Sequence, residues 1–482
     1  MNRRLPALLV LVLAPLALLA LFPLGVLSKS APPATPAFAA PGSPTLPFVP
    51  KAQFVTSTWF CGGVPNSADA QGGTVTVINP ADAPMQGRLT VFSDAAAIGP
   101  AEQAFEVPAR SHLTTVLSKV QRTGNYLSAM VEITGGGGFV EQTAVTSLGR
   151  AVSPCSNSTS SNWYFADNYT LNGSREDIII TNPFPDDAIL DFTFASNDGT
   201  RRPQNLQGFP VSGHSVAIVS EANLPKDEAV LAVTIHASRG RVVAARAQTY
   251  QGERFGYSLT LGAPSLSSDW SFPDGEAGPD VAFERYSIYN PTDADVTVTT
   301  NMWGITQGSF VGYRTDTIQA GNVLSFITRD FGQVPVGRHG MTFSTDGDAS
   351  IVVEQGITRK AGDTFVTSVV VGAPQVFEGY TRWSMAVGTD QAAPNVLIVM
   401  NLDSVAGTVT VKTLGAGGEV PVKGLEKVKL AKAGITAIAI PKTPGVLGSP
   451  LVVESTQRII VQRLLPRGAG LRGRTAALAL PG

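Results

Sequence analysis

The sequence predicts an all-β protein in which four similar β-sandwich domains follow one another along the chain. Three observations predict it: a tryptophan recurs at a nearly constant spacing, an asparagine closes a β-rich run after each tryptophan, and the composition favours strands and turns. Charged residues make up only 15% of the 482 residues, while Gly and Pro number 49 and 34, as is typical of short strands joined by turns. A chain of this length also predicts about three or four domains.

Residues 1–29 are predicted to form a membrane anchor or a signal sequence. Arg3 and Arg4 precede an apolar run of 23 residues from Leu5 to Leu27. A helix of that length crosses a bilayer core of about 30 Å, and the arginines would keep the N-terminus in the cytoplasm. We therefore expect a cell-membrane protein with a single N-terminal span and an extracytoplasmic C-terminal region. Secretion after signal cleavage near Ala39 is the alternative.

Residues 30–50 are predicted to form a Pro/Ala-rich linker. Such a composition favours extended chain and does not build a core. The prolines of this segment are Pro32, Pro33, Pro36, Pro41, Pro44, Pro47 and Pro50. We interpret it as a spacer between the membrane and the folded part.

The tryptophans and asparagines define the repeats. Trp59, Trp163, Trp270 and Trp383 recur at spacings of 104, 107 and 113 residues. Each is followed 18 to 20 residues later by an asparagine that ends a β-rich run, namely Asn79, Asn182, Asn290 and Asn401. A second alternating run follows each asparagine, which predicts a β-hairpin closed at that turn. The predicted repeats are residues 51–157, 158–264, 265–376 and the basic repeat 377–482.

The rest of each repeat predicts further short strands. Gln142, Gln355 and Gln462 are interpreted as the ends of final strands at a sheet edge. Glu141 and Glu354 precede two of these glutamines, whereas Ala245 and Val461 occupy that place in the other copies, a variation expected of edge residues. Seven or eight strands per repeat predict an immunoglobulin-like β-sandwich. A β-propeller with two four-stranded blades per repeat is the alternative, although no signature recurs at half the period.

The second repeat carries a resemblance to known proteins. The segments are Trp163 to Asp167, Thr181-Asn182-Pro183, Val242 to Arg246, Gly256 to Leu259 and Gly262-Ala263-Pro264. Together they resemble the tandem repeats of uncharacterised secreted actinobacterial proteins, which open with Trp-Tyr-Phe-Ala-acidic-Gly and close with Val-Val-Ala-Glu-Arg. This chain departs from that pattern at Asn168, at Ala245 and throughout the fourth copy. The resemblance implies an all-β extracytoplasmic protein and supplies no activity.

The two cysteines, Cys61 and Cys155, bracket the first repeat. In an oxidising exterior they can pair and close a loop of about 95 residues, which would contribute roughly 4 to 5 kcal/mol in the chain-entropy model. The four recurring tryptophans are interpreted as repeat-core aromatics. Stacking platforms for sugars are the alternative interpretation of these rings.

No catalytic, cofactor-binding or metal-binding residues are predicted. The sequence contains neither a Gly-x-Ser-x-Gly elbow nor a phosphate-binding loop or a dinucleotide fingerprint. The four histidines are scattered without metal-ligand spacing. Acidic pairs such as Asp167 with Asp177 are interpreted as turn residues rather than Ca²⁺ ligands. The balance of 35 basic against 37 acidic residues argues against nucleic acid as the main partner.

The function that these observations favour is that of a non-enzymatic envelope scaffold or accessory protein that presents β-domains to envelope proteins or cell-wall polymer. A carbohydrate-binding or cell-wall polymer-binding module is the alternative. Residues 383–482 hold 11 basic and 5 acidic residues, a net charge of +6 that leaves −8 for the rest. The lysines Lys423, Lys427, Lys429, Lys432 and Lys442 are candidates for contact with an anionic polymer. Arg458, Arg463, Arg467, Arg472 and Arg474 follow them.

Overall fold

The computed structural model describes residues 45–50, 56–66, 70–95, 97–305, 308–331, 334, 336–386, 395–468 and 470–482. The predicted apolar segment 5–27 and most of the predicted linker lie outside these residues. The chain from Pro44 to Gly482 forms one compact unit. Within the described ranges, no helix combines the length and apolar character needed to cross a membrane.

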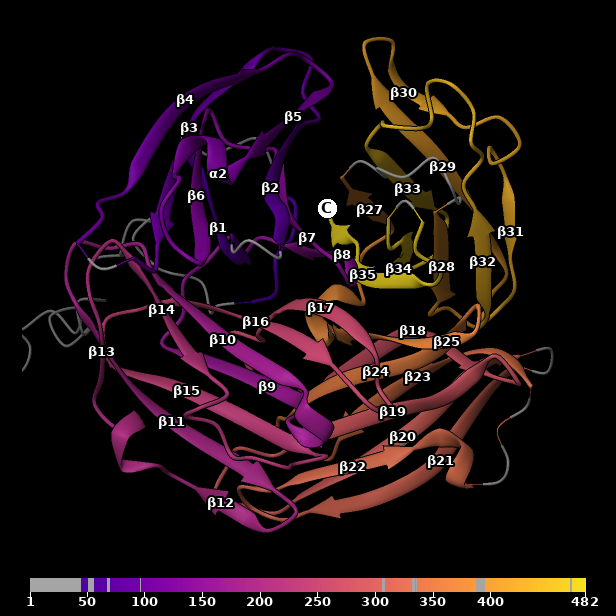
Figure 1. Ribbon diagram of the computed structural model, residues 1–482. Helices are drawn as coiled ribbons and strands as arrows, with labels where there is room; N and C mark the ends of the chain where they lie inside the picture. The colour runs from indigo at the N-terminus through magenta and orange to yellow at the C-terminus, as the bar shows by residue number, and fades with distance from the viewer. Residues whose placement is uncertain are drawn as a thin grey trace, which may run out of the picture. The chain divides into compact units, whose positions relative to one another are not determined.

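The all-β prediction is confirmed. The described strands form eight antiparallel sheets (Figure 1), and each sheet takes its strands from one of the four predicted repeats. Every repeat therefore contributes two sheets. We call these repeats 1 to 4 in chain order.

Repeats 1 and 2 contain the following elements. Repeat 1 has β1 (Thr56–Pro65), β2 (Ala70–Asn79), β3 (Met85–Ser93), β4 (Ala101–Val107), β5 (Ser111–Val116), α2 (Leu117–Val120), β6 (Tyr126–Thr134), β7 (Phe139–Thr146) and β8 (Gly149–Pro154). Repeat 2 has β9 (Asn162–Asn168), β10 (Arg175–Asn182), β11 (Ala188–Ser196), β12 (Gly199–Arg201), β13 (Phe209–Val211), β14 (Ser215–Ser220), β15 (Leu231–Arg239), β16 (Val243–Tyr250) and β17 (Gly256–Leu261), with 3₁₀ turns at Leu171–Gly173 and Gln204–Leu206.

Repeats 3 and 4 follow the same plan. Repeat 3 has β18 (Asp269–Ala277), β19 (Val281–Tyr289), β20 (Val296–Ile305), β21 (Gly308–Ile318), β22 (Val323–Ile327), β23 (Gly337–Thr345), β24 (Val352–Ala361), β25 (Thr364–Val371) and β26 (Ala373–Pro374), with 3₁₀ turns at Thr328–Phe331 and Gln375–Phe377. Repeat 4 has β27 (Arg382–Met385), β28 (Val396–Asn401), β29 (Gly407–Gly415), β30 (Gly418–Pro421), β31 (Val428–Leu430), β32 (Ile435–Ala439), β33 (Leu451–Ser455), β34 (Ile459–Pro466), β35 (Arg474–Leu478) and β36 (Leu480–Pro481).

The strand order is the same in all four repeats. One sheet runs β1-β6-β3-β4 in repeat 1, and the other runs β5-β2-β7-β8. The corresponding orders in repeat 3 are β18-β23-β20-β21, with the short β26 added beside β18, and β22-β19-β24-β25. The chain thus crosses repeatedly between two sheets, and among the described strands of repeat 1 only β3-β4 and β7-β8 are consecutive strands paired within one sheet, whereas a propeller blade is built from consecutive strands. This interleaving disfavours the propeller alternative.

The predicted hairpin at each asparagine is wrong. β2 pairs with β5 and β7, and β3 pairs with β4 and β6, so the strands on either side of Asn79 belong to different sheets. The turn is an arch that carries the chain from one sheet to the other. An alternating apolar pattern marks both strands equally well in a hairpin and in an arch, so the sequence pattern could not separate the two.

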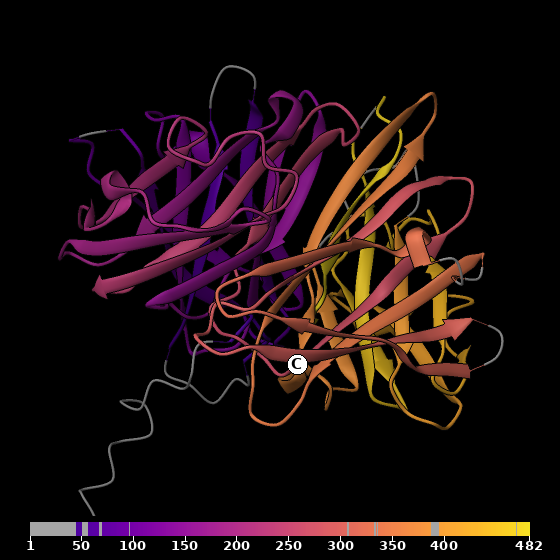
Figure 2. The same ribbon diagram turned by 90° about the horizontal axis from the view of Figure 1, so that it is seen from below.

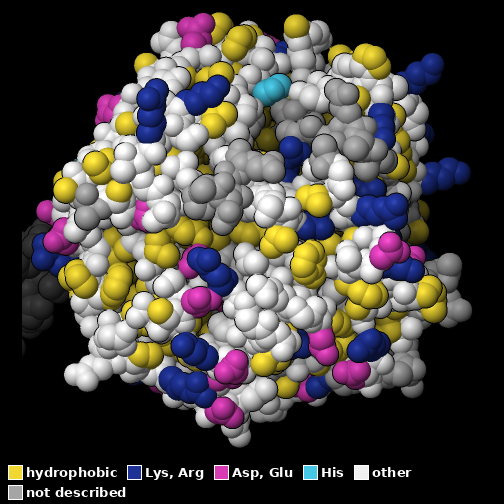
Figure 3. Space-filling model, in the orientation of Figure 1, with side chains coloured by type: hydrophobic (Ala, Val, Ile, Leu, Met, Phe, Trp, Pro, Cys, Tyr) yellow, Lys and Arg dark blue, Asp and Glu magenta, His cyan; other side chains and the backbone are white. Residues whose placement is uncertain are grey.

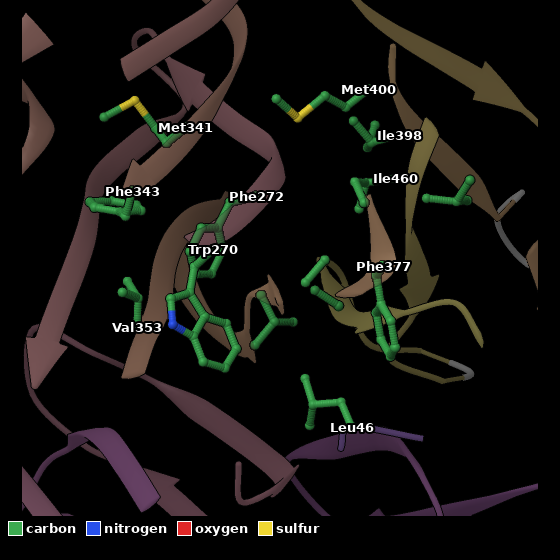
Figure 4. Close-up of a cluster of buried hydrophobic side chains, with 14 of the residues drawn as sticks. Leu46, Trp270, Phe272, Met341, Phe343, Val353, Phe377, Ile398, Met400 and Ile460 are labelled. Atoms are coloured by element: carbon green, nitrogen blue, oxygen red, sulfur yellow. The ribbon is translucent and has the colours of Figure 1, made fainter. Parts of the chain in front are cut away.

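The cores of neighbouring repeats are continuous. Trp270 and Phe272 of repeat 3 belong to the same buried cluster as Ile398 and Ile460 of repeat 4 (Figure 4). Leu46, only 4% exposed, joins this cluster. The end of the predicted 30–50 spacer, residues 45–50, therefore packs against the folded unit, contrary to the expectation that the whole segment stays outside a core.

The last main strand of each repeat brings the four repeats together. β8 contacts β17 and β35, and β25 contacts the same two strands, so the contacts among the repeats form a closed cycle. These four strands line a small apolar cavity of about 40 Å³, to which Leu46 and Pro47 also contribute. Figure 2 shows the strands of repeats 1 and 2, in indigo to magenta, beside those of repeats 3 and 4, in orange to yellow.

Candidate functional site

The residues singled out by the repeat pattern hold each repeat together. The four recurring tryptophans are at most 1% exposed. Three of them donate their indole N–H to the backbone carbonyl of a residue at or just before the start of β16, β24 or β34, for example Trp270 Nε1 to Ile351 O at 2.9 Å. Cys61 and Cys155 are joined by a disulfide, with 4.3 Å between their Cα atoms. It ties β1 to the residue that follows β8.

The repeated asparagines fasten the arches. The Asn290 amide is fully buried and donates to the carbonyls of Ala294, Ile318 and Gln319 at 2.7, 3.1 and 3.2 Å. Its Oδ1 accepts the backbone N–H of Thr292 at 3.1 Å. Asn79, Asn182 and Asn401 make the same kind of bonds. One side chain thus satisfies backbone groups on both sides of the turn, which no aliphatic residue could do.

A buried ion pair joins repeat 3 to repeat 2. Arg246 on β16 donates from Nη1 to Oε2 and from Nη2 to Oε1 of Glu354 on β24, both at 3.1 Å, and both side chains are at most 1% exposed. Glu354 Oε2 also accepts the backbone N–H groups of Ala166 and Asp167 at 2.7 and 2.6 Å. The Glu354 carboxylate therefore bonds both to Arg246 and to the backbone of β9, the first strand of repeat 2.

A second buried pair lies beside it, within repeat 2. Arg254 donates to both carboxylate oxygens of Asp167 at 2.9 and 3.0 Å, and Ser287 of repeat 3 donates to Oδ1 at 3.1 Å. Burial alone would raise the pKa of Asp167, but the attraction and hydrogen bonds of Arg254 outweigh it and lower that pKa. Arg254 also stacks over Tyr169 at 4.8 Å. Asp167 is therefore an ion-pair residue of the interior and not the predicted turn residue.

The same arrangement recurs where repeat 1 meets repeat 4. Glu141 of β7 forms an ion pair with Arg463 of β34, and both side chains are 3% exposed. Glu141 Oε1 accepts the backbone N–H of Ala386 at 3.0 Å, and Arg463 donates to the carbonyl of that residue at 3.0 Å. Ala386 lies three residues after Trp383, as Ala166 lies three after Trp163.

These contacts correct the predicted edge positions. Glu141 and Glu354 lie on β7 and β24, the interior strands that pair on both sides, and they are buried. The strand register also shows that Arg463, not Gln462, corresponds to Gln142 and Gln355. Repeat 4 is therefore displaced by one residue from the predicted alignment, and the position of Glu354 is filled there by Gln462 and not by Val461. The sequence of repeat 4 has diverged too far from the other copies for the strand register to be assigned from the sequence alone.

Glu176 and Glu284 are also buried. Burial raises the pKa of Glu176 to about 7, since the partial compensation by Arg246 is smaller. Glu284 and His339 lie 2.9 Å apart and are fully buried. Burial opposes charge on both, but their mutual attraction and hydrogen bond lower the pKa of Glu284 and raise that of His339. No group of three or more potential metal ligands gathers anywhere in the described ranges.

The four junctions between repeats fall into two kinds. Where repeat 1 meets repeat 2, β14 packs on β3 and β6, and where repeat 3 meets repeat 4, β32 packs on β20 and β23. At the junction of repeats 2 and 3, the corresponding strand β22 makes no comparable contact with β11 or β15 in the described chain. The ion pairs of Glu354 and Glu141 lie at the junctions 2–3 and 4–1. The two junctions without them are closed by strand packing.

An open groove of about 1060 Å³ occupies the junction of repeats 2 and 3. Its wall in repeat 2 is the outer face of the sheet β11-β15-β9, and its wall in repeat 3 is the turn after β19 and the turn before β22. The lining side chains are mainly polar: Asn162, Tyr164, Asp191, Thr193, Thr200, Arg202, Gln207, Thr234, His236, Thr292 and Asp293, with Leu266, Tyr289 and Pro291 as apolar or aromatic members. Sequence reasoning missed this groove because its walls come from two repeats.

The lysines of repeat 4 lie on its surface. All five candidates are exposed, and Figure 3 shows Lys and Arg side chains projecting where β30, β31 and β32 lie. The arginines that follow them in the sequence do not extend this surface as a group. Arg463 and Arg467 are 2% and 5% exposed, and Arg458 is paired with Asp403 at 2.7 Å.

One family model matches part of the chain. A family model described as a family of unknown function (DUF5719) matches residues 138–375. No curated protein matches the chain. Three solved structures are similar at low level: Thermotoga maritima 1070 (13% identity, 23% of this chain and 95% of that one, TM-score 0.21), a tetra-tandem repeat from the extending region of a large adhesion protein (13%, 87% and 98%, 0.11), and Streptomyces avermitilis α-L-rhamnosidase complexed with L-rhamnose (9%, 83% and 55%, 0.13).

Proposed function

We propose that this chain is a non-enzymatic, extracytoplasmic scaffold or accessory protein of the cell envelope, held by its N-terminal segment and presenting a fixed set of β-domains to envelope proteins or cell-wall polymer. The observation that carries the proposal is the pair of buried junctions, Glu354 with Arg246 and Glu141 with Arg463. Buried ion pairs that also bond to backbone groups hold a defined geometry. Charged residues at these junctions therefore serve the relative placement of the repeats.

We also propose that the repeats are immunoglobulin-like sandwiches of the kind found in secreted actinobacterial proteins. The second strand pairs with the fifth and the third with the sixth, as in immunoglobulin domains. The first and seventh strands differ, because β1 joins β6 rather than β2, and β7 joins β2 rather than β6.

Localisation and partner capture test this proposal. We expect the full-length protein to fractionate with membranes, to be accessible to protease added outside the cell, and to crosslink to envelope proteins or wall polymer in intact cells. If most of the protein is found in the medium and begins near Ala40, the protein is secreted and not anchored. Protection from external protease in intact cells, with lysis restoring cleavage, would refute the extracytoplasmic location.

A second proposal concerns the lysines of repeat 4. Exposed cations near an anionic polymer or headgroup layer contribute about 1 kcal/mol each and lose that contribution as salt screens them. We expect full-length protein with Lys427, Lys429 and Lys432 changed to Gln to bind teichoic acid more weakly at low salt. The matched control changes the exposed Lys119, Lys226 and Lys360 to Gln, which removes the same charge elsewhere. Equal binding by both triple variants would refute the proposal.

A further inference from the structure

The groove between repeats 2 and 3 is open for a structural reason. At the two junctions without a buried ion pair, a strand of the following repeat covers the outer sheet of the preceding one. Ile435 of β32, for example, reaches Gly340 of β23 closely enough that a Cβ added to that glycine would lie 2.9 Å from it. At the junction of repeats 2 and 3, Arg246 and Glu354 hold the repeats together near their first strands. The outer sheet face of repeat 2 is left uncovered beyond them.

This uncovered face carries two rows of polar side chains across three strands. Asp191, His236 and Asn162 lie opposite one another on β11, β15 and β9, and so do Thr193, Thr234 and Tyr164. Side chains two residues apart on a strand point to the same face. Six polar side chains therefore line one wall of the groove at regular spacing.

The polar groups are held in place and still have free hydrogen-bonding capacity. Asp191 Oδ1 accepts the N–H of Gly208 at 2.8 Å, which leaves its second oxygen available. His236 Nδ1 bonds to Asn162 Oδ1 at 2.9 Å, which leaves Nε2 available. The hydroxyls of Thr193 and Tyr164 have no hydrogen-bond partner within the described residues. A rigid sheet thus presents several polar groups that can still form hydrogen bonds.

The opposite wall comes from repeat 3. Tyr289 is 1% exposed, and its hydroxyl bonds to Thr234 at 2.9 Å, so it forms part of the base of the groove. Thr200 donates to the carbonyl of Gly321 at 3.0 Å, which bridges the two walls at one end. Tyr164 is only partly buried and offers aromatic surface between the polar rows. Aromatic surface among hydroxyl and amide groups suits the faces and edges of a sugar ring.

We propose that this groove binds a short segment of neutral oligosaccharide. The charged lining residues are one cation, Arg202, and two carboxylates, Asp191 and Asp293, so the groove has no excess of cations to select a polyanion. Its hydroxyl, amide, imidazole and carboxylate groups match a ligand rich in hydroxyls. The inference deepens the scaffold proposal, because it names a polymer class that the scaffold would meet at one junction, and it rests on the extracytoplasmic location proposed there.

The experiment uses the full-length protein on a glycan array, followed by titration calorimetry with the best-bound oligosaccharide. Thr193→Trp fills the groove without removing an internal hydrogen bond, and His236→Ala removes an exposed ligand-facing imidazole. The control is Thr315→Trp, which adds the same bulk to an exposed position on β21 outside the groove. Melting curves of all variants establish that they fold.

We expect wild type and Thr315→Trp to bind the same neutral glycan equally, and Thr193→Trp to bind it about tenfold more weakly or worse. His236→Ala should weaken binding by a smaller factor. Binding that survives Thr193→Trp, binding confined to anionic glycans, or no glycan bound at all would each overturn the inference. The scaffold proposal would stand in all three cases if the protein remained accessible to external protease, so the two failures are distinguishable.

Discussion

Replacing Glu354 by glutamine removes the negative charge paired with Arg246 while keeping the size of the side chain. Both partners are at most 1% exposed, so Arg246 would be left as a buried cation facing an amide. Breaking a buried pair by removing one partner costs about 3 to 5 kcal/mol, because the remaining charge has lost both water and its counterion. A glutamine oxygen in the place of Oε2 can still accept the N–H groups of Ala166 and Asp167, but the NH2 group in the place of Oε1 would face Arg246 Nη2, another donor. We therefore expect the free energy of unfolding to fall by about 4 kcal/mol.

Urea unfolding followed by tryptophan fluorescence measures this loss. Glu132→Gln is the matched control, since Glu132 pairs with Arg88 at 2.7 Å on the surface, with side chains 35% and 53% exposed, and such pairs contribute about 0 to 1 kcal/mol. Adding Arg246→Met to Glu354→Gln should recover part of the loss, because no buried charge remains. A loss no larger for Glu354→Gln than for Glu132→Gln, or a double variant less stable than the single one, would refute the reasoning.

Three further predictions concern single sites. Reducing the disulfide, or changing Cys61 to Ser, should lower the free energy of unfolding by roughly 4 to 5 kcal/mol, measured by urea unfolding with and without reductant. Asn290→Ala should cost on the order of 3 kcal/mol in the same assay, because three carbonyls lose a buried donor. Burial raises the pKa of Glu176 from 4.5 to about 7. The folded protein therefore keeps a proton on this carboxyl that the unfolded chain releases. Its contribution to stability is therefore fully present below about pH 4.5 and is lost as pH rises to about 7, so Glu176→Gln should gain about 3 kcal/mol relative to wild type between pH 4.5 and pH 8.

The tryptophan spacing predicted the all-β repeats because it reflects a constraint that every copy shares. Each tryptophan fills the same place on a first strand, and its ring is too large to be lost without leaving a cavity. The asparagine turns were predicted for the same reason, since one buried amide serves several backbone groups at each arch. The pairing of the flanking strands was not predictable from these residues. An arch and a hairpin use the same alternation, and only the distant strands, such as β5 and β7 for β2, decide between them.

The junctions could not be predicted because their residues are far apart in the sequence and differ between copies. Glu354 and Arg246 are separated by 108 residues, and Glu141 and Arg463 by 322. The difference between the copies at these positions is itself the sequence signal that points to the junctions. Glu141 and Glu354 occur in repeats 1 and 3, and Arg246 and Arg463 occur one position further along the strand in repeats 2 and 4. Variation of this kind indicates an edge residue when each repeat is considered alone, but it indicates charge complementarity when alternate repeats are compared.

This alternation makes the chain a pair of two-repeat halves. Glu354 of the second half bonds to Arg246 of the first, and Glu141 of the first half bonds to Arg463 of the second, which is the reciprocal contact that a twofold interface requires. Strand packing closes the junction inside each half, and ion pairs close the junctions between halves. A junction fixed by a compact ion pair does not need a covering strand, so the sheet face next to it can stay open to a ligand. The open groove and the buried pair at the junction of repeats 2 and 3 are thus two consequences of the same arrangement.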